Sequence, residues 1–171
     1  MTPAVWQRLD QVARNLVPFS LTLLLGFLGT VPIFFPGYKP VAPAMTLIAV
    51  YYWSIFRPDL MPPIAVFALG FFHDLLSGTP LGLSAFILLL VRSAVVSQRR
   101  FFMGNSFFIM WGGFLLISAG AMALAWEIIS WLESSFVHAT PAFFQFLITL
   151  ALFPAFTWFF VRMQQLFLRQ E

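Results

Sequence analysis

The chain has no cysteine and few charged residues. Without cysteine it forms no disulfide and offers no thiolate as a ligand or nucleophile, so cysteine usage does not identify its redox compartment. Charged residues make up 9% of its 171 positions and hydrophobic residues 61%, whereas soluble domains carry about 25% charged residues. This composition predicts an integral membrane protein with no separate soluble domain.

The motifs of soluble enzymes are also missing. The sequence contains no nucleophile elbow, no phosphate-binding glycine loop and no HExxH pair of histidines. His73, Asp74 and His138 could supply metal ligands, but the first two are neighbours that diverge by about 100° on a helix. An ion path would need ionisable groups across the bilayer, and its inner half offers little beyond Arg92. We therefore predict a protein that is not an enzyme and holds no metal or cofactor.

Apolar runs separated by short turns predict an all-α fold, a six-helix transmembrane bundle forming one domain over 1–171. The expected spans are 16–35, 41–56, 61–76, 81–96, 107–131 and 141–161. The third and fourth spans are near the lower limit for crossing and form a hairpin that either crosses or re-enters. Residues 1–15 form an amphipathic segment that either lies on the membrane surface or extends the first span.

The arginines lie between apolar runs and form no basic patch, so the positive charge does not indicate nucleic-acid binding. It instead indicates how the chain is oriented in the membrane. One side of a six-pass chain would carry Arg8, Arg14, Arg57, Arg99, Arg100, Arg162 and Arg169. The loops of the other side offer only Lys39. The positive-inside rule then places both termini in the cytoplasm. Asp74, Glu127, Glu133 and His138 would lie toward the outer side.

The most polar stretch within the apolar sequence is 69–82, at the tip of the expected hairpin. Ser77 and Gly78 predict a helix end, and Thr79-Pro80 predicts the cap and first residue of the next helix. Asp74 would lie about 18 Å along a helix that starts near Pro62, deep enough to be a candidate functional residue. The alternative is that its carboxylate caps backbone groups at the tip or pairs with an arginine.

Aromatic and basic residues indicate where the other helices end. Tyr51, Tyr52 and Trp53 before Arg57 are typical of an interfacial aromatic belt. Arg99-Arg100 predicts the turn after the fourth span, toward which Arg92 would reach along its aliphatic stem. Thr140-Pro141 predicts the start of the last span, with a bend at Pro154.

Two spans carry small residues at helical spacing, which would let another helix approach closely. They are Thr22, Gly26 and Gly29 in the first span, and Gly112, Ala119 and Ala123 in the fifth. Each face packs either against a helix of the same chain or against a helix of another chain. We hypothesise that one of them holds a partner's single membrane helix, with Asp74 and Glu127 adding polar contacts near the outer surface.

The hairpin resembles the signature of the MreD family of bacterial rod shape-determining membrane proteins: Gly70, Asp74 with the following apolar pair, Gly78, Pro80, and Leu81-Gly82. The Arg57 turn, the Arg99-Arg100 pair, Trp126-Glu127, and Pro154 with Trp158 also follow in the order of that family. His73 departs from the pattern, where this position is usually apolar.

The resemblance implies a non-enzymatic scaffold of the elongation machinery in the bacterial inner membrane. It implies MreC as the partner whose helix is held, and the peptidoglycan synthase of RodA and a class B penicillin-binding protein, together with MreB, in a larger complex. Membrane lipid would surround the bundle. The alternative is a small-molecule-binding or transport component similar to the vitamin-capture subunits of energy-coupled transporters, which are six-helix bodies of similar size.

Overall fold

A computed structural model describes residues 3–31, 36, 41–133 and 138–167, and of 3–15 and 167 it describes the backbone alone. These ranges contain six α-helices, a short 3-10 helix and no strand, which confirms the predicted all-α class. The helices are α1 (Pro3–Leu28), α2 (Met45–Phe56), α3 (Pro63–Ser77), α4 (Leu83–Met103), α5 (Phe107–Leu132) and α6 (Thr140–Phe167), with η1 (Pro58–Leu60) between α2 and α3.

The first helix is continuous from Pro3 and contains Pro18, so residues 3–15 and the start of the first expected span form one helix. We expected this span to reach residue 35, but α1 ends at Leu28 and the next described residues form a turn and a bend. The Gly29 amide donates to the Leu25 carbonyl at 2.8 Å and closes the last turn. Val31 precedes a proline, which disfavours further helix at that position. Residues 32–35 lie outside the described part.

The fourth helix is longer than predicted. We expected a turn at Arg99-Arg100, whereas both arginines belong to α4, which continues to Met103. Arginine favours helix, and no glycine or proline interrupts the sequence before Gly104. The Asn105 side chain donates to the Phe101 carbonyl at 2.6 Å just after the helix ends. The turn therefore lies at 104–106.

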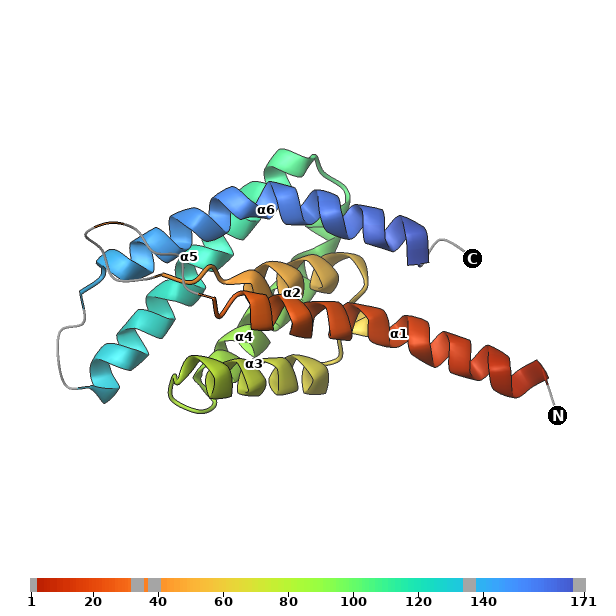
Figure 1. Ribbon diagram of the computed structural model, residues 1–171. Helices are drawn as coiled ribbons and strands as arrows, with labels where there is room; N and C mark the ends of the chain where they lie inside the picture. The colour runs from red at the N-terminus through yellow and green to blue at the C-terminus, as the bar shows by residue number, and fades with distance from the viewer. Residues whose placement is uncertain (1–2, 32–35, 37–40, 134–137, 168–171) are drawn as a thin grey trace.

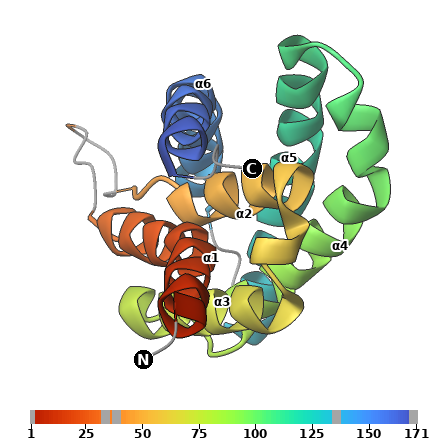
Figure 2. The same ribbon diagram turned by 90° about the vertical axis from the view of Figure 1, so that its right-hand side faces the viewer.

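Helix α2 lies at the centre of the fold and packs against α1, α4 and α6 (Figure 2). Tyr51, Tyr52 and Trp53 are at most 1% exposed, so the predicted interfacial belt is wrong. The Tyr51 hydroxyl donates to the Met110 carbonyl at 2.8 Å, and the Tyr52 hydroxyl donates to Gln164 Oε1 at 3.0 Å. These aromatic residues therefore join α2 to α5 and α6 inside the protein.

Consecutive helices run in opposite directions, so the start of α1 and the end of α6 lie at the same end of the molecule (Figure 1). Arg57 and the α4–α5 turn lie on this half, and Arg162 is near the end of α6. The α3–α4 turn and the α5–α6 junction lie at the opposite end, where Glu133 and His138 are exposed. Among the side chains that the structure describes, basic and acidic residues are thus largely separated along the bundle axis, Asp59 beside Arg57 being an exception.

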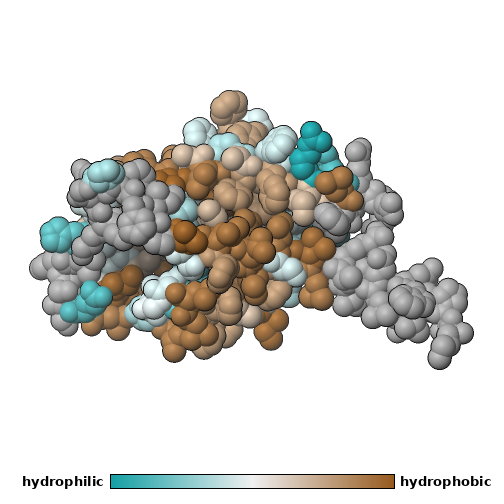
Figure 3. Space-filling model, in the orientation of Figure 1, coloured by the Kyte–Doolittle hydropathy of each residue, from teal (hydrophilic) through white to brown (hydrophobic). Residues whose placement is uncertain are grey.

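On the face that Figure 3 shows, the middle of the molecule is mostly apolar, and the most hydrophilic residues drawn in colour lie toward its edges. Within the described residues, α5 and α6 are long and apolar enough to cross a membrane by length and composition. Helix α2 has 12 residues, or about 18 Å, against a hydrocarbon core of about 30 Å. Six complete crossings therefore stay a prediction.

Candidate functional site

Asp74 is fully buried at the corner between α3 and α4. Its Oδ1 accepts a hydrogen bond from the Thr79 hydroxyl at 2.8 Å, and its Oδ2 accepts one from the Gly82 amide at 2.9 Å. The Ser84 amide donates to both carboxylate oxygens, at 3.1 and 3.2 Å. The carboxylate therefore caps the N-terminus of α4, where free amides and the helix dipole favour a negative charge.

The turn between the two helices depends on two glycines with positive φ. Gly78 ends α3 with a φ of 67°, and its amide donates to the Asp74 carbonyl at 3.0 Å. This confirms the left-handed helix end predicted at that residue. Gly82, with a φ of 91°, precedes the first residue of α4.

The predicted start of the next helix at Thr79-Pro80 is wrong, because α4 begins at Leu83. The cap comes from Asp74 on the preceding helix, so Thr79 does not cap α4 directly. Its hydroxyl instead donates to that carboxylate. Pro80 lies within the turn, where its carbonyl accepts from the Leu83 amide at 3.1 Å.

The glycine at the start of the motif sets the distance between the two helices of the hairpin. A Cβ atom on Gly70 would overlap the backbone of Ala85, so only glycine allows α3 and α4 to approach this closely. At the other end of the hairpin, Arg92 Nε donates to the Met61 carbonyl at 2.7 Å. Arg92 therefore contacts the segment just before α3, whereas we expected it to reach toward a turn at Arg99-Arg100.

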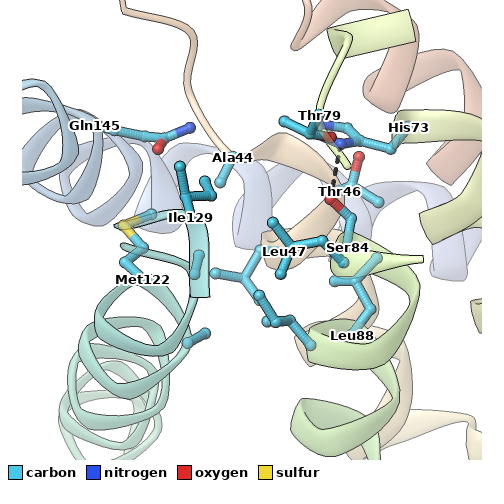
Figure 4. Close-up of a pocket in the computed structure, with 14 residues that line it drawn as sticks. Ala44, Thr46, Leu47, His73, Thr79, Ser84, Leu88, Met122, Ile129 and Gln145 are labelled. Atoms are coloured by element: carbon cyan, nitrogen blue, oxygen red, sulfur yellow. Dashed lines mark hydrogen bonds between the residues drawn. The ribbon is translucent and has the colours of Figure 1, made fainter. Parts of the chain in front are cut away.

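His73 is half-buried beside the cap. Its Nδ1 lies 3.3 Å from the Ser84 hydroxyl oxygen, so the histidine and the serine link α3 to the first turn of α4 (Figure 4). In the part of the chain that the structure describes, no group of three or more histidine, aspartate or glutamate residues could hold a metal ion.

The small-residue face of α1 packs against another part of the same chain. Thr22 is fully buried, and its hydroxyl donates to the Pro18 carbonyl at 2.6 Å. A Cβ atom on Gly26 would lie 2.9 Å from the Thr46 hydroxyl oxygen, and one on Gly29 would lie 3.1 Å from the Pro43 carbonyl oxygen. Helix α2 and the residues just before it therefore occupy this face.

The small-residue face of α5 is open. Gly112, Ala119 and Ala123 are exposed, and a Cβ atom on Gly112 would meet nothing within 4 Å. Glu127 is exposed one turn after Ala123. The structure thus places Glu127 at the end of an open helix face and Asp74 inside the hairpin.

Sequence reasoning missed a cavity between α2, the α3–α4 hairpin and α5 (Figure 4). We call it the hairpin cavity, and its volume is about 170 Å³. His73 and Ser84 line it beside apolar residues of α2, α4 and α5. Only the departure of His73 from an apolar pattern pointed to this region.

A family model described as rod shape-determining protein MreD matches residues 10–164 of the chain. The match includes the hairpin, all of α2 to α5 and most of α6. No curated protein and no solved structure matches the chain.

Proposed function

The chain belongs to the MreD family of rod shape-determining membrane proteins, and from this premise we propose that it is a non-enzymatic scaffold that binds the membrane helix of MreC. In this role it would hold MreC in position and help direct lateral peptidoglycan synthesis. RodA, a class B penicillin-binding protein and MreB would join the same complex. The open face of α5 is the observation that carries this proposal.

The α5 face suits a helix better than lipid chains alone. From Gly112 to Glu127 it spans 16 residues, a rise of about 22 Å, which is most of the hydrocarbon thickness. Small residues let two backbones approach, and close packing supplies much of the attraction between helices in lipid. Leu116, 72% exposed, lies between the small residues and can insert between side chains of the partner.

Asp74 and the α1 face are already occupied by contacts within the chain, so neither offers a surface to a partner. Asp74 has no exposed surface, and its carboxylate is engaged by the hairpin. The α1 face is filled by α2. We therefore assign Asp74, Thr22, Gly26 and Gly29 to internal packing, and Gly112, Ala119 and Glu127 to contact with MreC.

The test is co-purification with MreC after widening the α5 face. Gly112→Leu and Ala119→Leu should each lower the amount of MreC recovered about tenfold or more, because the backbones can no longer approach. Ala151→Leu is the matched control, since Ala151 is an exposed residue of similar size on α6. The control should insert into the membrane and recover MreC as the unchanged protein does. Full recovery with both α5 variants would refute the proposed contact.

We also propose that the protein lies in the bacterial inner membrane with both termini in the cytoplasm. The shared end of α1 and α6, with Arg57 on the same half, supports this orientation. A reporter that is active only in the cytoplasm should be active when it is fused before residue 1 or after residue 171, and a reporter that is active only in the periplasm should be inactive at both positions. Activity of a periplasmic reporter at either end would contradict the topology without affecting the MreC contact.

A further inference from the structure

The hairpin cavity has a polar end and an apolar end. Figure 4 shows Thr46, His73 and Thr79 gathered at one end, with Leu47 and Leu88 lying away from them. A second cavity of about 310 Å³ shares Met122, Ala125, Ile129 and Gln145 with the first and lies between α5, α6 and the segment before α2. The two spaces together reach the size of small-molecule sites, roughly 300–1,000 Å³.

A buried hydroxyl at the polar end lacks a partner. Thr46 is 5% exposed, and its Oγ1 makes no hydrogen bond in the described structure. The Ala42 carbonyl, four residues earlier, instead accepts a hydrogen bond from Gln145 Nε2 at 2.8 Å. The Thr46 oxygen has almost no accessible surface and lies against Gly26 of α1, so it is enclosed between α1 and α2. A ligand in the cavity would therefore not reach this hydroxyl, and the His73 ring is the polar group at this end that could bind one.

The polar groups around it are uncharged donors and acceptors. The Ser84 hydroxyl contacts His73 Nδ1, which leaves Nε2 of the ring for a second partner. Neither cavity is lined by lysine, arginine, aspartate or glutamate among the described residues. A phosphate or carboxylate would therefore find no cation, whereas an ester carbonyl or a hydroxyl could bind.

The position and width of the cavity restrict the ligand further. Its polar end lies where α3 ends and where α4 and α6 begin, which is the level of a membrane interface. Its apolar walls lie between α4 and α5, and the space is partly open. A helix, about 10–12 Å across with its side chains, is too wide for this space. A single hydrocarbon chain is narrow enough to enter it.

We propose that the hairpin cavity binds the ester region and one hydrocarbon chain of a membrane glycerolipid. The ester carbonyl accepts from Nε2 of the His73 ring, and the chain lies against Leu47, Leu88 and Ala121. The phosphate, where the lipid has one, stays outside. Binding at this site is independent of the contact with MreC, because the α5 residues that line the cavity lie on a different face from Gly112 and Ala119.

The experiment is native mass spectrometry of the full chain purified in neutral detergent with defined lipids. The unchanged protein should retain one lipid. Ala121→Phe should lower retention at least about tenfold, because its ring fills the space that the chain would occupy. Ala94→Phe, at an exposed position of α4 that does not line the cavity, is the matched control and should retain the lipid.

Three lipids, which differ in whether they carry an ester, a phosphate or a free carboxylate, show which part of the lipid is recognised. Diacylglycerol and phosphatidylglycerol should bind comparably, and free fatty acid should bind more weakly because its carboxylate has no cation. Equal retention by Ala121→Phe and the unchanged protein would mean that the lipid is only peripheral and would overturn the proposal. A requirement for phosphate, or a water-soluble molecule in place of lipid, would also overturn it. If Ala121→Phe does not fold, Ala125→Phe fills the same cavity from the next turn.

Discussion

The α1 face and the α5 face have the same pattern of small residues and opposite surroundings. Thr22, Gly26 and Gly29 are covered by α2 and by the segment before it. Gly112 and Ala119 are exposed. A small-residue pattern therefore shows that a helix can approach closely, and only the fold shows whether that helix belongs to the same chain.

The two acids in the membrane region differ in the same way. Asp74 has no exposed surface and accepts hydrogen bonds from the Thr79 hydroxyl and from two backbone amides. Glu127 is exposed at the end of the α5 face. The first acid caps a helix of the hairpin, and the second is accessible to the partner that we propose.

Replacing the two acids should give the largest difference. Asp74→Ala leaves the amides of Gly82 and Ser84 without their acceptor, so the free energy of unfolding should fall by about 3 kcal/mol. Glu127→Ala should change it by less than about 0.5 kcal/mol. Denaturant unfolding in detergent micelles measures both values. Equal losses would show that Asp74 is not the cap on which the hairpin depends.

Enlarging one glycine on each face should give the next largest difference. Gly26→Leu forces a side chain against Thr46 and should lower the free energy of unfolding by about 1–3 kcal/mol. Gly112→Leu meets open space and should leave stability nearly unchanged while reducing recovery of MreC. Thermal unfolding in the same detergent compares the two variants. A stable Gly26→Leu protein would contradict the packing of α1 on α2.

Removing the charge of Glu127 should give the smallest effect. Glu127→Gln keeps the size of the side chain and loses one exposed ionic contact, so recovery of MreC should fall about two- to fivefold. The loss should shrink at high salt, because exposed ion pairs are screened. Recovery that is unchanged at low salt would remove Glu127 from the contact.

Features set by neighbouring residues were predictable from the sequence. The six helices and the helix end at Gly78 follow from apolar runs and from the left-handed conformation that glycine allows. Asp74 was a candidate from its depth alone, and capping was one of two alternatives. That it caps a helix starting nine residues later depends on the path of the turn, which no local pattern determines.

Features set by distant residues were not predictable. Tyr52 precedes an arginine by five residues, which suggests an interface, yet its hydroxyl is bonded to Gln164, 112 residues away in sequence. Nothing near Gly26 or Gly112 distinguishes the covered face from the open one. The hairpin cavity also depends on contacts among α2, α3, α4 and α5, so its size could not be predicted from local sequence patterns.

Cysteine cross-linking to MreC tests the central claim most directly, because the chain has no cysteine of its own. Ala119→Cys and Ala123→Cys, each paired with single cysteines along the membrane helix of MreC, should form disulfides in intact membranes. Thr22→Cys, on the covered face, should form none. Cross-links from Thr22→Cys and none from either α5 position would contradict the assignment of the open face to the partner.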